Sequence, residues 1–210
     1  MTESAIQGCP PAKLVFELAL NGVHHSARPT WKLGETVRFY RDVLGLKLVH
    51  AITAKGWGPV DHPDFLHFFF DSGQGSTIAF FYYIGTKCPE YMRPRPMDVF
   101  YRAHHTAWQV KDVDELRAWR ARLERQGVNV SPDTKHELIE SIYFEDPNGY
   151  MLEITIQLRP FLECDANDAD LTMKAAMLLE ERALKQGHPI PDIYAVWREK
   201  ADLVESPVET

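Results

Sequence analysis

The sequence carries the same order of secondary-structure signals twice, and this repeat limits the possible folds more than any other feature. In the first copy, the segment GETVRFYRDVLGL places apolar side chains at helical spacing, and Gly45 is a typical residue for a helix end. In the second copy, DVDELRAWRARLERQG shows the same pattern, and Gly127 ends it. We therefore expect one amphipathic helix in each copy.

Strand-like runs surround each predicted helix. In the first copy, an apolar run at residues 14–20, continued to His25, precedes the helix, and LKLVHAI, DFLHFFFD and STIAFFYYI follow it. In the second copy, AHHTAWQV precedes the helix, and VNV, ESIYFED and YMLEITIQ follow it. Each copy therefore predicts the order β-α-β-β-β.

The two copies align at their last strands. The run GSTIAFFYY, which begins at Gly75, superposes on GYMLEITIQ, which begins at Gly149. This superposition places Ala79 opposite Glu153. An alanine cannot bind a metal, so a site built from this pair of positions has one ligand fewer than a symmetric site.

The repeat sets the expected domain organisation, that of an α+β protein with two βαβββ modules. After residue 157 the pattern changes, and DADLTMKAAMLLEERALKQG predicts a helix with Asp168 or Asp170 as its N-cap and Gly187 as its stop. The helix has an apolar stripe that needs a partner surface, either the modules or a second subunit. The expected boundaries are an N-terminal arm at 1–13, a first module at 14–87, a proline-rich linker at 88–99, a second module at 100–158 and a helical C-terminal extension at 159–210.

Composition excludes several classes of protein. The formal net charge of −7 disfavours binding to a nucleic-acid backbone. No apolar run reaches the roughly 18 residues that a membrane-spanning helix needs, and the N-terminal residues do not resemble a signal peptide. The three cysteines are widely spaced and odd in number, which indicates reduced thiols and a cytoplasmic location.

Two His-His pairs stand near the heads of equivalent predicted strands. Neighbouring side chains on a strand point to opposite faces, so only one histidine of each pair can face inward. We expect His25 and His105 to face inward and His24 and His104 to face away. Glu153 lies within the apolar run YMLEITI, where a carboxylate needs a partner or a bound cation.

Together, the two inward histidines and the carboxylate predict a metal site. Two imidazoles and one carboxylate cover one face of an octahedral metal and leave positions open for substrate and for oxygen or water. The predicted ligands are His25, His105 and Glu153. The alternative is that each histidine is an ordinary hydrogen-bonded residue of a strand, which is the more common situation for a single histidine.

The repeat and two of its motifs resemble the vicinal oxygen chelate superfamily, which includes glyoxalase I, fosfomycin-resistance transferases, bleomycin-binding proteins and extradiol dioxygenases. The motifs are FYRDVLGL and YFEDPNGYMLE, and the resemblance covers about residues 14–157. It implies two modules that form a cupped mixed sheet with the metal inside the cup. It also implies the same three ligands, His25, His105 and Glu153.

A longer stretch, TKHELIESIYFEDPNGYMLE, is similar to the signature of extradiol ring-cleaving dioxygenases. The resemblance implies that His136 and Tyr143 contact the oxygens of the substrate. A core tyrosine and a surface histidine are the alternatives for these two residues. The two-domain enzymes of that family also have an acid-base histidine shortly before the second metal histidine, and residues 88–101 contain none. Three residues are open as substitutes for that base: Tyr91, His62 and His67.

The resemblance therefore implies a non-haem Fe(II) dioxygenase that opens a catechol-like aromatic ring with O₂. Mn, Zn and Ni are possible metals, and a homodimer is expected. One alternative is a metal-dependent isomerase or transferase related to glyoxalase or to the fosfomycin-resistance proteins. A second alternative is a metal-free protein that binds an aromatic compound. The aromatic runs FLHFFF and AFFYY fit an aromatic-lined pocket, and they fit equally a sheet that is buried on both faces.

Overall fold

A computed structural model describes residues 22–93, 95 and 99–205. The described residues form two compact units, 22–159 and 160–205. The predicted strand at residues 14–20 and the N-terminal arm lie outside the described residues. None of the helices formed by the described residues is both long enough and apolar enough to span a lipid bilayer.

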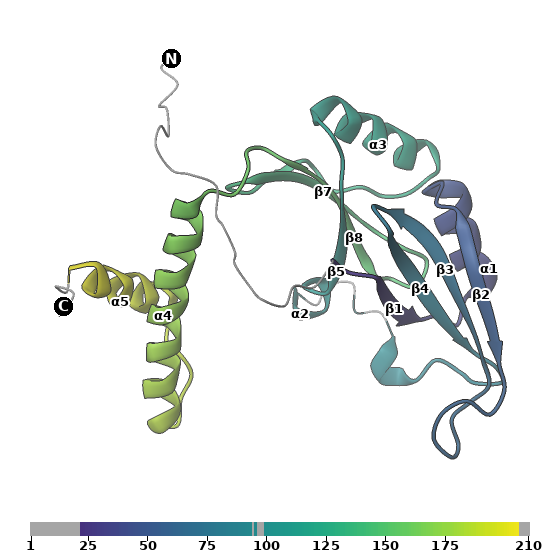
Figure 1. Ribbon diagram of the computed structural model, residues 1–210, viewed down its shortest axis with the longest axis horizontal. Helices are drawn as coiled ribbons and strands as arrows, with labels where there is room; N and C mark the ends of the chain where they lie inside the picture. Colours follow the sequence, from purple (N-terminus) through teal and green to yellow (C-terminus); the bar gives the residue numbers. More distant parts are fainter. Residues whose placement is uncertain (1–21, 94, 96–98, 206–210) are drawn as a thin grey trace. The chain divides into compact units, whose positions relative to one another are not determined.

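The first unit contains the two predicted modules, each with its own four-stranded mixed sheet (Figure 1). In each sheet the first strand is parallel to the last, and the remaining pairs are antiparallel. The strand orders are β1-β4-β3-β2 and β5-β8-β7-β6. The two modules are therefore confirmed as equivalent in topology, and they form two hydrogen-bonded sheets instead of one.

The secondary structure of the first module follows the sequence pattern closely. Its helix has a regular first part and a wider π-helical last part, and it ends at Gly45, which has a φ of +76°. The elements of the module are β1 (His25–Pro29), α1 (Leu33–Arg38), the π-helical turn η1 (Phe39–Val43), β2 (Leu48–Ala54), β3 (Phe65–Gly73) and β4 (Ser76–Tyr83).

The second module differs from the prediction at one strand. The segment VNV at 128–130 is not a strand, and the short edge strand lies a few residues later, at β6. A short helix, α2, also forms just before β5 and was not predicted. The connecting helices and the elements of the module are the 3₁₀ helix η2 (Glu90–Met92), α2 (Val99–Arg102), β5 (His105–Gln109), α3 (Val113–Arg125), β6 (Thr134–Lys135), β7 (Ile139–Glu145) and β8 (Met151–Gln157).

The start of α3 shows why the sequence folds as predicted there. The Asp112 carboxylate accepts a hydrogen bond from the backbone N–H of Glu115 at 3.0 Å. The Glu115 carboxylate in turn accepts from the backbone N–H of Lys111 at 2.8 Å. Each carboxylate satisfies a backbone donor at the helix start, as in a capping box. At the other end of α3, Gly127 has a φ of +75° and ends the helix as expected.

One apolar core lies between the helices and the sheets and includes residues of both modules. Tyr40 is fully buried, its ring lies 4.7 Å from that of Phe80, and its hydroxyl donates to the Asp146 carboxylate at 3.1 Å. The rings of Phe39 and Phe144 also join the two modules, at 6.5 Å. The helix of the first module is therefore fixed to the β7–β8 turn of the second, which carries the PNG sequence.

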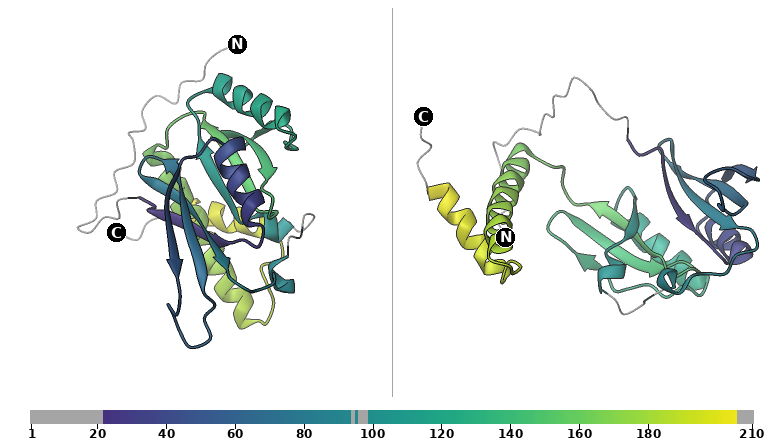
Figure 2. Two further views of the ribbon diagram at one scale, coloured as in Figure 1. Left: turned by 90° about the vertical axis from the view of Figure 1, so that its right-hand side faces the viewer. Right: turned by 90° about the horizontal axis from the view of Figure 1, so that it is seen from below.

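The remaining unit is a helical hairpin formed by α4 (Glu163–Lys185) and α5 (Ile193–Glu205), two adjacent helices in Figure 2. The helical tail is confirmed, but α4 begins five to seven residues before the predicted N-cap. Its first turn is stabilised by the Asp165 carboxylate, which accepts from the backbone N–H of Leu162 at 2.8 Å. Asp168 instead pairs with Lys200 of α5 at 2.6 Å. Part of the apolar stripe is buried within the hairpin, at Ala175 and Ala183.

Replacement of Ile78 by valine tests the position of the core. Ile78 lies on β4 and is only 1% exposed, so removal of one methyl group from its side chain would leave a small cavity. We expect Ile78→Val to lower the free energy of unfolding by about 1 kcal/mol, measured by urea denaturation with an unchanged slope. Ile84→Val is the matched control, because Ile84 is 48% exposed. Equal losses in the two variants would contradict the described core.

Candidate metal centre

The register of the strands makes the two modules directly comparable. In the second module, Ala107 of β5 pairs with Glu153 of β8, and Tyr143 of β7 pairs with Glu153 from the other side. In the first module, Ala27 pairs with Ala79, and Phe69 pairs with Ala79. The predicted equivalence of Ala79 and Glu153 is therefore confirmed.

The same register shows where the polar groups are concentrated. Phe69 occupies the position of Tyr143, and Ala79 occupies that of Glu153, so the first module has no side-chain oxygen at either position. His25 and His105 are equivalent, because each heads its strand two residues before the paired alanine. The oxygen-bearing groups of the candidate site thus belong to the second module.

Glu153 and His105 lie in direct contact. Glu153 is 3% exposed, and its Oε2 lies 3.0 Å from Nε2 of His105. His105 Nδ1 lies 3.1 Å from the Ala103 carbonyl oxygen. Because a carbonyl oxygen and a carboxylate oxygen both only accept, the ring donates from Nδ1 to Ala103 and from Nε2 to Glu153, and a bound metal would take the place of the Nε2 proton. A backbone partner of this kind is common for histidines that bind metals.

Ser141 holds the other oxygen of the same carboxylate. It is fully buried on β7, and its hydroxyl donates to Oε1 of Glu153 at 2.5 Å. The carboxylate is therefore oriented by Ser141 from one side and faces His105 on the other. Ser141 was not predicted from the sequence. The available signal was a hydroxyl residue two positions before Tyr143, on the same face of a strand whose other positions are largely apolar.

Tyr143 and His136 extend this arrangement. The Tyr143 hydroxyl lies 2.9 Å from Nε2 of His136, and its ring meets that of His105 edge to face, with centroids 6.1 Å apart. Burial and the nearby Glu153 carboxylate raise the pKa of the Tyr143 phenol. The phenol is therefore protonated at neutral pH and can act as a hydrogen-bond donor. Four of the five predicted site residues are thus close together: His105, His136, Tyr143 and Glu153.

The structure does not bring His25 to these four residues. Its ring lies 5.8 Å from that of Phe69 and 6.3 Å from that of His67, both on β3 of the first sheet. Its Nδ1 lies 2.9 Å from Nδ1 of His24, so His24 is a neighbour of His25. Within the part of the chain that the structure describes, no three His, Cys, Asp or Glu side chains are close enough to hold a metal ion. The role of His25 as a ligand therefore stays a prediction.

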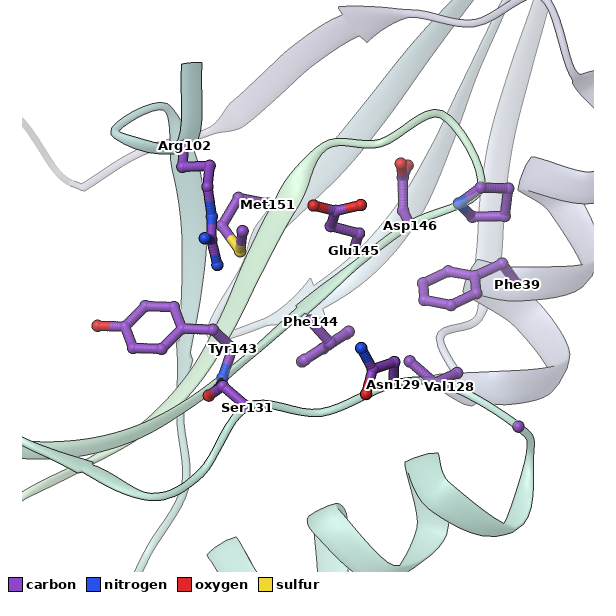
Figure 3. Close-up of a pocket in the computed structure, with 12 residues that line it drawn as sticks. Phe39, Arg102, Val128, Asn129, Ser131, Tyr143, Phe144, Glu145, Asp146 and Met151 are labelled. Atoms are coloured by element: carbon purple, nitrogen blue, oxygen red, sulfur yellow. Dashed lines mark hydrogen bonds between the residues drawn. The ribbon is translucent and has the colours of Figure 1, made fainter. Parts of the chain in front are cut away.

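A pocket of about 650 Å³ lies next to this group of residues (Figure 3). Tyr143, Glu145 and Met151 line it from β7 and β8, and Phe39 lines it from the first module. The Tyr143 hydroxyl points away from Phe39 in Figure 3. His105 and Glu153 are not among its described lining residues. The candidate metal centre is therefore defined by the His105–Glu153 contact and not by this pocket.

The donor set fits a divalent metal in part. His105 and Glu153 supply one imidazole nitrogen and one carboxylate oxygen, and Ser141 and Ala103 hold these donors in place. An imidazole and a carboxylate suit Fe, Mn, Zn or Ni, and they leave room for further ligands. A third protein ligand would have to come from the first module, where His25 occupies the equivalent strand position.

Paired βαβββ modules with an imidazole–carboxylate pair on the second module define a protein of the vicinal oxygen chelate type. The chain belongs to the Glyoxalase/Bleomycin resistance protein/Dioxygenase superfamily, whose family model matches residues 22–154. The helical tail lies outside the matched segment.

Individual relatives are distant. The chain is 33% identical over 52 residues to a protein named Putative ring-cleaving dioxygenase MhqA of Bacillus subtilis (strain 168). That match covers 25% of this chain and 16% of the relative, so the chain spans about a sixth of the relative's length in the match.

One solved structure supports the fold. The crystal structure of SMU.1112c is 21% identical with a TM-score of 0.52, and the match covers 65% of this chain and 99% of that one. The crystal structure of a putative dioxygenase from Bacillus subtilis subsp. subtilis str. 168 is 26% identical with a TM-score of 0.49, over 65% of this chain and 40% of that one.

Replacement of Ser141 tests how the carboxylate is oriented. In Ser141→Ala, Oε1 of Glu153 loses its hydrogen-bond donor and the carboxylate can rotate. We expect metal affinity to fall about 10-fold, as for other partners that orient metal ligands, when measured by competition with a chelating dye. Ser76→Ala at the start of β4 is the control and should leave affinity unchanged. An unchanged affinity in Ser141→Ala would show that Ser141 does not orient a metal ligand.

Proposed function

We propose that this protein is a metal-dependent dioxygenase of the extradiol type, which opens a catechol-like aromatic ring with O₂. One observation carries the proposal, which is a single cluster of polar side chains. The Glu153 carboxylate contacts the Ser141 hydroxyl and the His105 imidazole. The Tyr143 ring meets that of His105, and its phenol is hydrogen-bonded to His136. The extradiol signature selects His136, Tyr143 and Glu153, the repeat selects His105, and Ser141 is an addition from the structure. The weak similarity to a protein named as a ring-cleaving dioxygenase supports the same reaction class.

In the proposed site, His105 and Glu153 hold the metal, His25 is the third protein ligand, and Fe(II) is the metal. When bound, Fe(II) would supply adjacent positions for two neighbouring substrate oxygens and for O₂, and it would lower the pKa of the substrate hydroxyls. Ser141 orients Glu153, and the Ala103 carbonyl fixes the ring of His105 with Nε2 directed toward Glu153, where a metal would replace the Nε2 proton.

Tyr143 and His136 act on the substrate. The Tyr143 phenol is protonated at neutral pH and donates a hydrogen bond to a substrate oxygen that gains negative charge during the reaction. His136 contacts the phenol at 2.9 Å, and it orients Tyr143 and positions the second substrate oxygen. Both atoms of O₂ enter the ring-opened product, so no external reductant is required.

The base that removes the substrate proton is not His62 or His67 in this proposal. His67 stacks on Phe81 with centroids 3.7 Å apart, and burial lowers the pKa of its imidazole. His62 contacts Phe65 and Tyr83 in the first module. His136 is the histidine next to Tyr143. Its Nε2 contacts the phenol oxygen, and we assign the base to its other ring nitrogen, Nδ1.

Oxygen uptake tests the proposal. Protein purified under nitrogen and loaded with Fe(II) should consume O₂ with at least one member of a panel of substituted catechols and form a yellow ring-opened product. No uptake, together with thiol-dependent turnover of an α-ketoaldehyde, would assign the protein to the isomerase class. No metal binding under nitrogen would favour a metal-free binding protein.

A further inference from the structure

A second pocket, of about 360 Å³, lies in the first module, where the loop between β2 and β3 meets the segment that follows β4. Its volume lies within the range of pockets that bind small molecules. None of the four clustered site residues described above lines it. Its described lining residues are Pro29, Trp31, His62, Pro63, Tyr83, Thr86, Lys87, Pro89, Tyr91 and Met92.

The indole of Trp31 is held in a fixed position in this pocket. Its Nε1–H donates to the Thr86 hydroxyl at 3.0 Å, and that hydroxyl donates to the Tyr83 carbonyl at 3.0 Å. The rings of Trp31 and Tyr83 lie 6.5 Å apart. The indole N–H is therefore satisfied within the protein, and the aromatic surface of Trp31 remains for contact with a ligand.

The imidazole of His62 is also held in place. Its Nδ1 lies 3.0 Å from the Pro63 carbonyl, so Nδ1 carries a proton and Nε2 is an acceptor. Its ring meets Phe65 and Tyr83 edge to face, at 5.5 and 5.7 Å. Gly58 packs against it from behind, since a Cβ at Gly58 would lie only 2.9 Å from the ring. A ring fixed from several directions is arranged for binding before a ligand arrives.

The charge in the pocket indicates what kind of ligand fits. Lys87 is the one described lining residue with a permanent charge, and no ion pair is found for it among the described residues. The other lining groups are mainly aromatic rings, prolines and a methionine. Aromatic rings and prolines favour a flat apolar ligand, and an unpaired ammonium favours an anionic substituent.

We propose that this pocket binds a planar aromatic carboxylate, separately from the reaction at the second module. The aromatic ring lies between Trp31, Tyr83 and Tyr91, and the carboxylate pairs with Lys87. His62 accepts a hydrogen bond from a hydroxyl group where the ligand has one. The proposal does not depend on the dioxygenase activity, because no residue of the candidate metal centre takes part.

Calorimetry with the 210-residue chain tests this site, with 2-naphthoate as the probe. We expect one saturable site, weakened about 10-fold or more by Trp31→Ala and about 5-fold by Lys87→Gln. The neutral probe 2-naphthol should bind equally well to the parent and to Lys87→Gln. Two matched controls, Trp57→Ala and Lys47→Gln, remove an exposed indole and an exposed ammonium outside the pocket and should leave binding unchanged.

Two results would overturn the proposal. The first is the absence of saturable binding of 2-naphthoate to the parent at millimolar concentration. The second is that Glu153→Gln abolishes binding of the probe while Lys87→Gln and Trp31→Ala bind it as the parent does. The probe would then occupy the candidate metal centre and not the second pocket. Lys87 is exposed, so Lys87→Gln remains informative even if Trp31→Ala does not fold. A failure of the dioxygenase assay would change neither the expected binding of 2-naphthoate nor the expected effects of Trp31→Ala and Lys87→Gln.

Discussion

Glu153→Gln is expected to lose most of the bound metal and all oxygen uptake while it keeps its fold. The amide has nearly the shape of the carboxylate, and Ser141 can still donate to its oxygen. The amide has no negative charge, however, and is a poor ligand for a divalent cation. We expect metal affinity to fall about 100-fold or more, a larger loss than for a residue that only orients a ligand.

Metal content after purification under nitrogen and competition with a chelating dye measure this loss. The matched control is Glu140→Gln, on the opposite face of β7, where Glu140 is also buried and pairs with Lys135 at 3.5 Å. This control should bind metal as the parent does. If Glu153→Gln binds metal as well as Glu140→Gln does, Glu153 is not a ligand and the proposed centre is wrong.

Tyr143→Phe is expected to lower kcat between about 10-fold and 100-fold, with little change in KM for the catechol. The phenol contacts His136, and its hydrogen bond to the substrate strengthens only as charge develops on the substrate oxygen. Phenylalanine keeps the ring that meets His105 edge to face. Metal affinity should therefore remain within about 2-fold of the parent value, since the ligands are unchanged.

The control for this prediction is Tyr82→Phe, which removes a hydroxyl from β4 of the first module, outside the candidate centre and outside the lining of the second pocket. Its kcat should equal that of the parent. A Tyr143→Phe enzyme with a raised KM and unchanged kcat would show that Tyr143 contributes to binding alone. An enzyme with both parameters unchanged would show that the phenol has no part in the reaction.

The repeat allowed the sequence to predict most of the first unit. Hydrophobic periodicity located both helices and nearly all strands, and the alignment of the last strands placed Ala79 opposite Glu153, as the register confirms. The segment VNV was wrong as a strand: residues 128–130 form no strand, and the backbone hydrogen bond to β7, from Ser131 to the Tyr143 carbonyl, lies just after the segment. Short apolar runs at a sheet edge do not distinguish a strand from a loop.

The hydrophobic pattern of the sequence could not predict the contacts between the two modules. A strand register follows from alternation within one module, but the distance between two modules depends on how their helices and turns pack. The Tyr40–Asp146 hydrogen bond and the Phe39–Phe144 contact set that packing, and they join residues about a hundred positions apart in the chain. For this reason His105 and Glu153 could be paired from the sequence, whereas the position of His25 relative to them could not.

Residues that orient the site were only partly predictable. His136 and Tyr143 were identified by resemblance, and the structure places their side chains in contact. Ser141 was missed because a buried serine on a strand is common and its role depends on the side chain opposite. The start of α4 was also missed, since the sequence offered Asp168 and Asp170 as N-caps, whereas the N-cap is Leu162 and its backbone N–H donates to the Asp165 carboxylate.

Anomalous scattering from crystals loaded with Fe(II) under nitrogen tests the central claim most directly. We expect one iron per chain, with His105 Nε2 and a Glu153 carboxylate oxygen both at about 2.0 to 2.2 Å, as is usual for these donors on a divalent metal, and with His25 as the third protein ligand. Iron bound elsewhere, or a saturated crystal with no iron between His105 and Glu153, would contradict the account.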